Sequence, residues 1–137
     1  METNSPNRPS VQLSYPTDKL IAIIDTMPDA EQARQELLEA GFAPDAIGVQ
    51  HGTHAVEHTI HYTDFDPFPH LARLLHVGSI EHEQAVVYEQ ALRQGQSVIA
   101  VHAPRAEARQ RALRIMEAHN AHYVNFYGTW TIETLKP

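Results

Sequence analysis

The sequence predicts an α+β domain with a four-stranded sheet of the ferredoxin-like, split βαβ type. The apolar runs Leu20–Ile24 and Val98–Val101 are too short for helices and are typical of central strands buried on both faces. The segments 46–51 and 122–127 alternate apolar and polar residues, as edge strands with one buried face do. The predicted strands therefore cover residues 20–25, 46–51, 97–102 and 122–127.

A doubly wound parallel α/β sheet is the alternative fold. Helices cover both faces of such a sheet, so all of its strands tend to be apolar throughout. The half-polar second and fourth strands instead favour two central strands between two edge strands. In this arrangement we expect the two central strands to run parallel, side by side.

Helical spacing and capping residues predict the helices between these strands. The first spans 26–41, with a Thr at its N-cap and a Gly after its last turn. Two more, at 66–78 and 79–95, form an insertion between the second and third strands. The last spans 104–120, where Pro opens the helix and Asn is suited to its C-terminal cap.

The chain divides into a tail and one domain. Residues 1–18 carry three prolines among polar residues and predict a disordered tail without the features of a signal peptide. Residues 19–137 form the predicted α+β domain, and the apolar segment 129–135 should dock on it. No run approaches the roughly 18 apolar residues of a membrane span, so we expect a cytoplasmic protein.

Composition excludes several classes of function. A formal charge of −7 disfavours binding to nucleic acid or to an anionic membrane. The chain has no cysteine, which removes disulfides, thiolate nucleophiles and Cys-ligated zinc. Ten histidines among 137 residues are the unusual feature, and no catalytic signature accompanies them.

Three phrases of the sequence carry a family resemblance. They are Gly41-Phe42 followed by Ile47-Gly48-Val49, the run from Tyr88 to Gly95, and the run from Val98 to Val101. Together they resemble the general stress protein domain of the heat-induced YflT type, over residues 19–127. The resemblance implies a small stress-associated α+β domain without established catalytic residues. The histidine-rich segment 51–76 and the C-terminal tail depart from that pattern.

The first candidate site is a ligand-binding cluster of Asp25, His102 and His122. If the central strands are parallel, Asp25 and His102 are neighbours at their carboxyl ends, and His122 starts a strand that arrives there. Nearby helix N-termini would favour an anion. The functions open to this cluster are binding of a small anionic ligand or acid–base chemistry, and the structural alternative is that these side chains only satisfy helix ends and each other.

The second candidate site lies within the histidine-rich segment. Imidazole is a ligand for zinc, copper, nickel and iron, so four closely spaced histidines are a candidate divalent-metal site. The same residues also fit a polar surface segment or a pH-responsive one. The four residues are His51, His54, His58 and His61.

The third candidate site is an aromatic stripe near one sheet face. Tyr and Trp combine apolar area with a polar group and are enriched at protein interfaces, which predicts a homodimer contact. By analogy with ferredoxin-like dimers, the stripe could also face heme or another flat aromatic ligand. Its members are Tyr123, Asn125, Tyr127 and Trp130.

These observations favour a non-enzymatic, stress-associated binding or regulatory module that acts as a homodimer and needs no cofactor. The alternative is a His-dependent metal- or heme-binding protein, extending to a cofactor-free or heme-linked oxygenase-like enzyme.

Overall fold

The computed structural model describes residues 17–53, 71–75, 82–128 and 132–136. Within these residues the chain forms an α+β domain, as predicted. Its elements are β1 (Lys19–Ile24), α1 (Met27–Glu39), the 3₁₀ turn η1 (Pro44–Ala46), β2 (Ile47–His51), α3 (Leu71–Leu74), α4 (His82–Arg93), β3 (Ser97–His102), α5 (Ala106–Ala118), β4 (His122–Tyr127) and β5 (Ile132–Lys136). Of the helices predicted at 66–78 and 79–95, residues 66–70 and 76–81 lie outside the described part of the chain.

The sheet has five strands in the order β2-β3-β1-β4-β5, and each neighbouring pair is antiparallel. The prediction of four strands was wrong in number, because residues 132–136 pair with the outer edge of β4. Their apolar side chains are only half-buried, which explains why the sequence gives them a weak strand pattern.

The predicted parallel orientation of the two central strands was also wrong. In the β1–β3 pair Lys19 lies opposite His102 and Ile24 lies opposite Ser97. The cause is the insertion between β2 and β3, which leaves the sheet at His51 and returns beside it at Ser97. Since the chain re-enters at the end where it left, β3 runs antiparallel to β2 and to β1.

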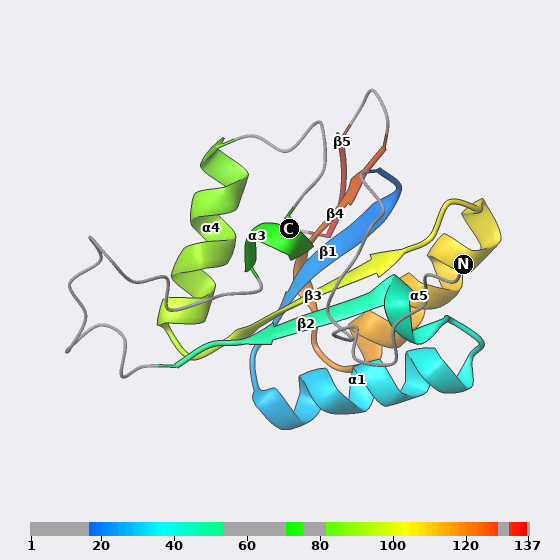
Figure 1. Ribbon diagram of the computed structural model, residues 1–137, viewed down its shortest axis with the longest axis horizontal. Helices are drawn as coiled ribbons and strands as arrows, with labels where there is room; N and C mark the ends of the chain where they lie inside the picture. The colour runs from blue at the N-terminus through cyan, green and yellow to red at the C-terminus, as the bar shows by residue number, and fades with distance from the viewer. Residues whose placement is uncertain (1–16, 54–70, 76–81, 129–131, 137) are drawn as a thin grey trace, which may run out of the picture.

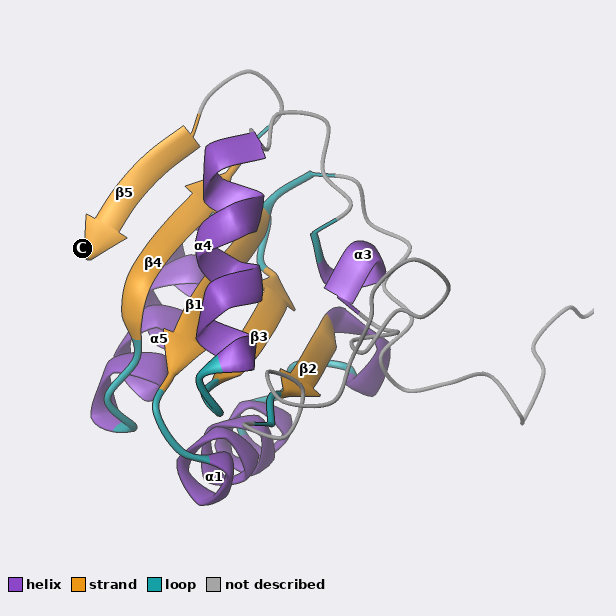
Figure 2. Ribbon diagram, turned by 90° about the vertical axis from the view of Figure 1, so that its left-hand side faces the viewer, coloured by secondary structure: helices purple, strands orange, loops and turns teal. Residues whose placement is uncertain are grey.

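Helices cover both faces of the sheet (Figures 1 and 2). On one face α1 and α5 pack against Leu20, Ala22 and Ile24 of β1. On the other face α3 and α4 pack against Ile21 and Ile23. Every residue of β1 is buried, which confirms the prediction of a central strand with two buried faces.

Caps define the helix ends that position the polar residues described below. The Thr26 hydroxyl accepts a hydrogen bond of 3.2 Å from the Asp29 amide, as predicted for the N-cap of α1. Gly95 and Asn120, the predicted C-terminal cap residues, have φ angles of +89° and +68°. None of the described helices is both long and apolar enough to cross a membrane.

Candidate functional site

Three polar residues meet at the end of the sheet where β1 stops. Asp25 directly follows β1, Gln96 directly precedes β3, and His122 is the first residue of β4. Because β3 and β4 flank β1 on its two sides, their first residues arrive on either side of Asp25. We call Asp25, Gln96 and His122 the sheet-end cluster.

The carboxylate of Asp25 organises this cluster. Its Oδ1 atom accepts hydrogen bonds from His122 Nε2 and from Gln96 Nε2, each at 2.8 Å. The hydrogen bond from His122 is the main cause that lowers the pKa of Asp25; partial burial acts in the opposite direction, and Gln96 adds to the lowering. Asp25 therefore stays ionised at neutral pH and still exposes about half of its side chain, 54%.

A cavity of about 210 Å³ adjoins the sheet-end cluster. Gln96 belongs to both, and Ile23 on the cavity floor lies opposite His122 in the sheet. The wall combines three carboxamides with three aliphatic side chains: Gln90, Gln94, Gln96, Ile23, Val87 and Ala91. Carboxamides donate and accept hydrogen bonds, so this wall can orient a small polar ligand beside the carboxylate.

The third predicted member, His102, lies at the opposite end of the sheet. It pairs with Lys19 at the start of β1, because β3 runs antiparallel to β1. Burial is the largest cause that lowers the pKa of His102, and a hydrogen bond to the backbone of Thr17 opposes it. The structure thus brings Asp25 and His122 together, and the inclusion of His102 was wrong.

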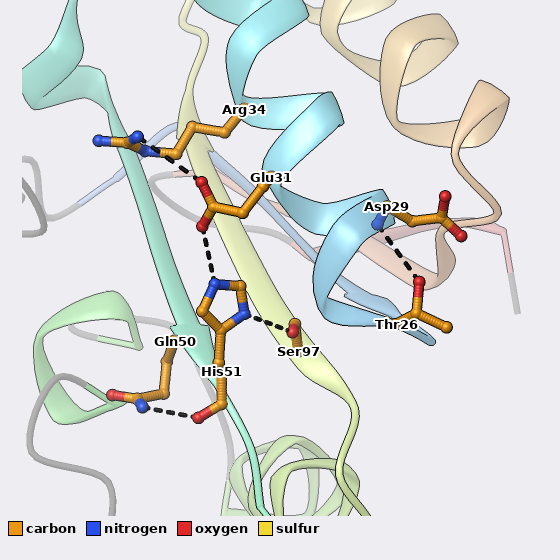
Figure 3. A network of polar contacts seen from close by, with 7 residues as sticks. All are labelled: Thr26, Asp29, Glu31, Arg34, Gln50, His51 and Ser97. Atoms are coloured by element: carbon orange, nitrogen blue, oxygen red, sulfur yellow. Dashed lines mark hydrogen bonds and ion pairs between the residues drawn. The ribbon is translucent and has the colours of Figure 1, made fainter.

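His51 joins β2 to β3 and α1 (Figure 3). Its Nδ1 lies 2.8 Å from the Ser97 hydroxyl, and its Nε2 lies 2.7 Å from Oε2 of Glu31. The other carboxylate oxygen of Glu31, Oε1, lies 3.9 Å from Arg34. This Ser-His-Glu series resembles a hydrolase triad in composition, but Ser97 is completely buried and cannot reach a substrate. The contacts therefore fasten the end of β2 to α1.

The remaining predicted metal ligands, His54, His58 and His61, lie outside the described residues. Within the described part of the chain, no three His, Cys, Asp or Glu side chains are grouped to hold a metal ion.

The aromatic stripe takes part in packing within the chain. The Tyr88 hydroxyl of α4 donates to the carbonyl of Ile21 at 3.2 Å, lies 3.0 Å from the Tyr127 hydroxyl, and accepts from Asn125 Nδ2 at 3.2 Å. Burial raises the pKa of Tyr127 to about 12 and raises that of Tyr88 further, so both phenols stay neutral. We call Tyr88, Asn125 and Tyr127 the buried polar network.

The buried polar network changes the assignment of the predicted interface. Asn125 is 2% exposed and Tyr127 is fully buried, because α4 covers this face of the sheet. Neither side chain can contact a second subunit in this arrangement. Tyr123 is half-buried and packs edge-on against Tyr88 with 5.3 Å between ring centroids, and Trp130 lies outside the described residues.

Lys19 is fully buried and was not among the predicted site residues. Its Nζ atom donates to the carbonyl of Leu74 in α3 at 3.5 Å, and burial lowers its pKa to about 8. The period-two pattern of β1 was the available signal, because it places Lys19 on the same face as Ile21 and Ile23.

No protein-family model, curated protein or solved structure matches the chain.

Proposed function

We propose that the protein is a non-enzymatic binding or regulatory module that holds a small polar ligand at the sheet-end cluster. One observation carries the proposal: Gln96, which lines a cavity of about 210 Å³, also donates a hydrogen bond of 2.8 Å to the Asp25 carboxylate, which His122 orients from the other side. This volume is below the roughly 300–1,000 Å³ of drug-sized pockets, so the ligand is a small one.

The chemistry of the wall selects the class of ligand. Asp25 is ionised and accepts hydrogen bonds, which favours a ligand with an amine or amide donor. The aliphatic floor of Ile23, Val87 and Ala91 suits a short apolar portion of the same molecule. A net charge of −7 also attracts a cationic ligand over an anionic one.

Solvent exposure favours binding over catalysis at this cluster. Electrostatic catalysis depends on polar groups fixed in a site from which water is excluded. Asp25 and His122 instead expose 54% and 38% of their side chains.

A ligand panel tests the proposal. Small amines and primary amides, screened by thermal shift, should include a saturable binder whose shift is lost in Asp25→Asn and reduced in Gln96→Ala. Asp45→Asn makes the same charge change at an exposed carboxylate outside the cluster and should keep the full shift. Absence of any binder, or equal binding by Asp25→Asn, would overturn the proposal.

We extend the proposal to fold type and assembly. The order β2-β3-β1-β4 with α1 and α5 on one face supports a ferredoxin-like core to which α3, α4 and β5 are added. The stress-associated role rests on the family resemblance of the sequence alone.

We place the homodimer contact away from Asn125 and Tyr127, because α4 buries both side chains. Sedimentation across a wide concentration range tests for the dimer. A protein that stays monomeric throughout that range would exclude it.

Metal binding is the second candidate, and one contact favours it. His51 Nε2 lies 2.7 Å from a carboxylate oxygen of Glu31. Imidazole and carboxylate are both metal ligands, and His54, His58 and His61 follow shortly after His51 in the sequence.

Zinc or nickel titration of untagged protein tests this candidate. His51→Gln should weaken metal binding. His119→Gln alters a similar pair with Glu36 and should leave metal binding unchanged. The heme alternative has no comparable support, because α4 occupies the face predicted to meet heme.

A further inference from the structure

A second cavity, of about 190 Å³, lies between α5 and β5. It is on the opposite face of the sheet from α4, so it is separate from the sheet-end cluster. Its lining combines one cation, one anion, one carboxamide and three aliphatic side chains: Arg109, Glu133, Gln110, Ala106, Leu113 and Leu135.

Arg109 is held in place and keeps hydrogen-bonding capacity. Its guanidinium stacks on the Phe126 ring, 3.7 Å from the centroid, and one terminal nitrogen donates to the carbonyl of Pro104 at 3.1 Å. Its Nε atom is buried and has no acceptor among the described residues. A guanidinium fixed in this way can donate hydrogen bonds to a carboxylate with little further loss of side-chain entropy.

The start of α5 adds to the anion-binding character of this end. Its N-cap residue, Arg105, makes no side-chain capping hydrogen bond, and Ala106 at the first position of the helix lines the cavity. Helix N-termini present amide groups and a partial positive charge, so a carboxylate beside Arg109 would also be favoured by α5.

Glu133 supplies the opposite charge. It lies directly across the sheet from Phe126, the residue on which Arg109 stacks, yet no ion pair joins Arg109 and Glu133 within the described structure. Two opposite charges that line one small cavity without pairing match a ligand with both charges. The aliphatic side chains of Leu113 and Leu135 complement an apolar group.

We propose that this cavity binds a free α-amino acid with an aliphatic side chain. The carboxylate lies at Arg109 and the start of α5, the ammonium group at Glu133, and the side chain against Leu113 and Leu135. A simple carboxylate would leave Glu133 without its partner, and a simple amine would leave Arg109 without one. The volume limits the ligand to about the size of one amino acid.

L-Leucine is the probe that tests this proposal, by calorimetric titration and by amide chemical shifts of α5 and β5. We expect saturable binding to the wild-type protein, with 4-methylpentanoate, which lacks the amino group, and isoamylamine, which lacks the carboxylate, each at least tenfold weaker. No saturable binding of leucine, or equal binding of 4-methylpentanoate, would overturn the assignment. These ligand comparisons need no variant, so they hold even if a substitution disturbs folding.

Three variants locate the site. Arg109→Gln and Glu133→Gln should each weaken leucine binding at least tenfold, and Glu133 is exposed, so its variant should keep the fold. Arg114→Gln is the matched control, because it removes a positive charge from an exposed position of the same helix that does not line the cavity. A loss in Arg114→Gln equal to that in Arg109→Gln would show a diffuse charge effect and refute the site.

Discussion

At the scale of single residues, buried polar groups on the α4 face of the sheet depend on partners within the chain. On the α4 face, the buried polar network satisfies its donors within the chain, since Tyr88 bonds Ile21, Asn125 and Tyr127. Buried hydroxyls and amides are costly unless they are paired, so each member depends on the others. Alternation in β4 could predict which residues share a face, but not that a tyrosine 37 residues earlier would meet Asn125.

Tyr88→Phe should destabilise the protein by about 2 kcal/mol, because it leaves the Asn125 amide buried without this acceptor. Urea unfolding followed by circular dichroism measures the change. Tyr123→Phe is the control: its hydroxyl has no hydrogen bond to any described residue, and its effect should stay within about 0.5 kcal/mol. Equal effects of the two substitutions would contradict the role assigned to the network.

Lys19→Met should stabilise the protein by about 1 kcal/mol at pH 7, because a buried ammonium is replaced by an apolar chain of similar length. Burial lowers the folded-state pKa to about 8 from an ordinary 10.5, so the unfolded state binds more protons between these values. Wild-type stability should therefore rise as the pH increases above 8, and this rise should be absent in Lys19→Met.

Urea unfolding at several pH values from 7 to about 9 measures this difference, because most tyrosines of the unfolded chain are still neutral there. Lys136→Met changes the other lysine of the chain, which is exposed on β5, and should retain the wild-type pH dependence. A wild-type curve without a rise above pH 8 would refute a lowered pKa for Lys19.

At the scale of elements, four of the five described strands were predicted, but the direction of β3 relative to β1 was wrong. The ranges 97–102 and 122–127 agree with β3 and β4, because turn residues bound each apolar or alternating run. An apolar run such as Val98–Val101 indicates a strand buried on both faces, whether that strand is parallel or antiparallel to its neighbours. The direction of the strand depends on where the insertion re-enters the sheet. For this reason Asp25 and His122 could be placed together from the sequence, while His102 was placed at the wrong end.

Gly52 follows β2 and packs closely against the turn where the insertion returns to the sheet. Its amide donates to the carbonyl of Gln96 at 2.9 Å, and the amide of Thr53 donates to the carbonyl of Leu92 at 3.0 Å. A Cβ atom at Gly52 would overlap backbone atoms of Leu92 and Gln96. This close approach fixes the end of β2 against the turn between α4 and β3.

Gly52→Ala should therefore cost about 2–3 kcal/mol, because backbone rather than a flexible side chain would have to move. Gly41→Ala is the comparison: its φ of +105° is strained for alanine, but the new methyl group meets no atom within 4 Å. We expect about 1 kcal/mol there. Thermal unfolding of both variants measures the difference, and a Gly52→Ala protein as stable as Gly41→Ala would show that the contact is not tight.

At the scale of the whole molecule, burial decreases from the centre of the sheet toward β5. Both faces of the sheet carry helices, and β1 lies between β3 and β4 with all of its residues buried. β5 lies at the edge of the sheet and pairs only with β4 within the described chain (Figure 2). Its residues are exposed or half-buried. The cavity that we assign to an amino acid lies against this least buried strand, so its ligand would connect β5 to α5.

Amide hydrogen exchange should follow this gradient. Opening of β1 and β3 requires loss of both helical layers, so their amides should exchange only through global unfolding. Amides of β5 should exchange orders of magnitude faster, because separating β5 from β4 exposes little apolar surface. Native-state exchange measured by NMR with increasing denaturant distinguishes the two classes. If the β5 amides proved as protected as those of β1, a contact such as the proposed homodimer would have to cover the outer edge of β5. Dilution of the sample would then dissociate that contact and speed the exchange of the β5 amides.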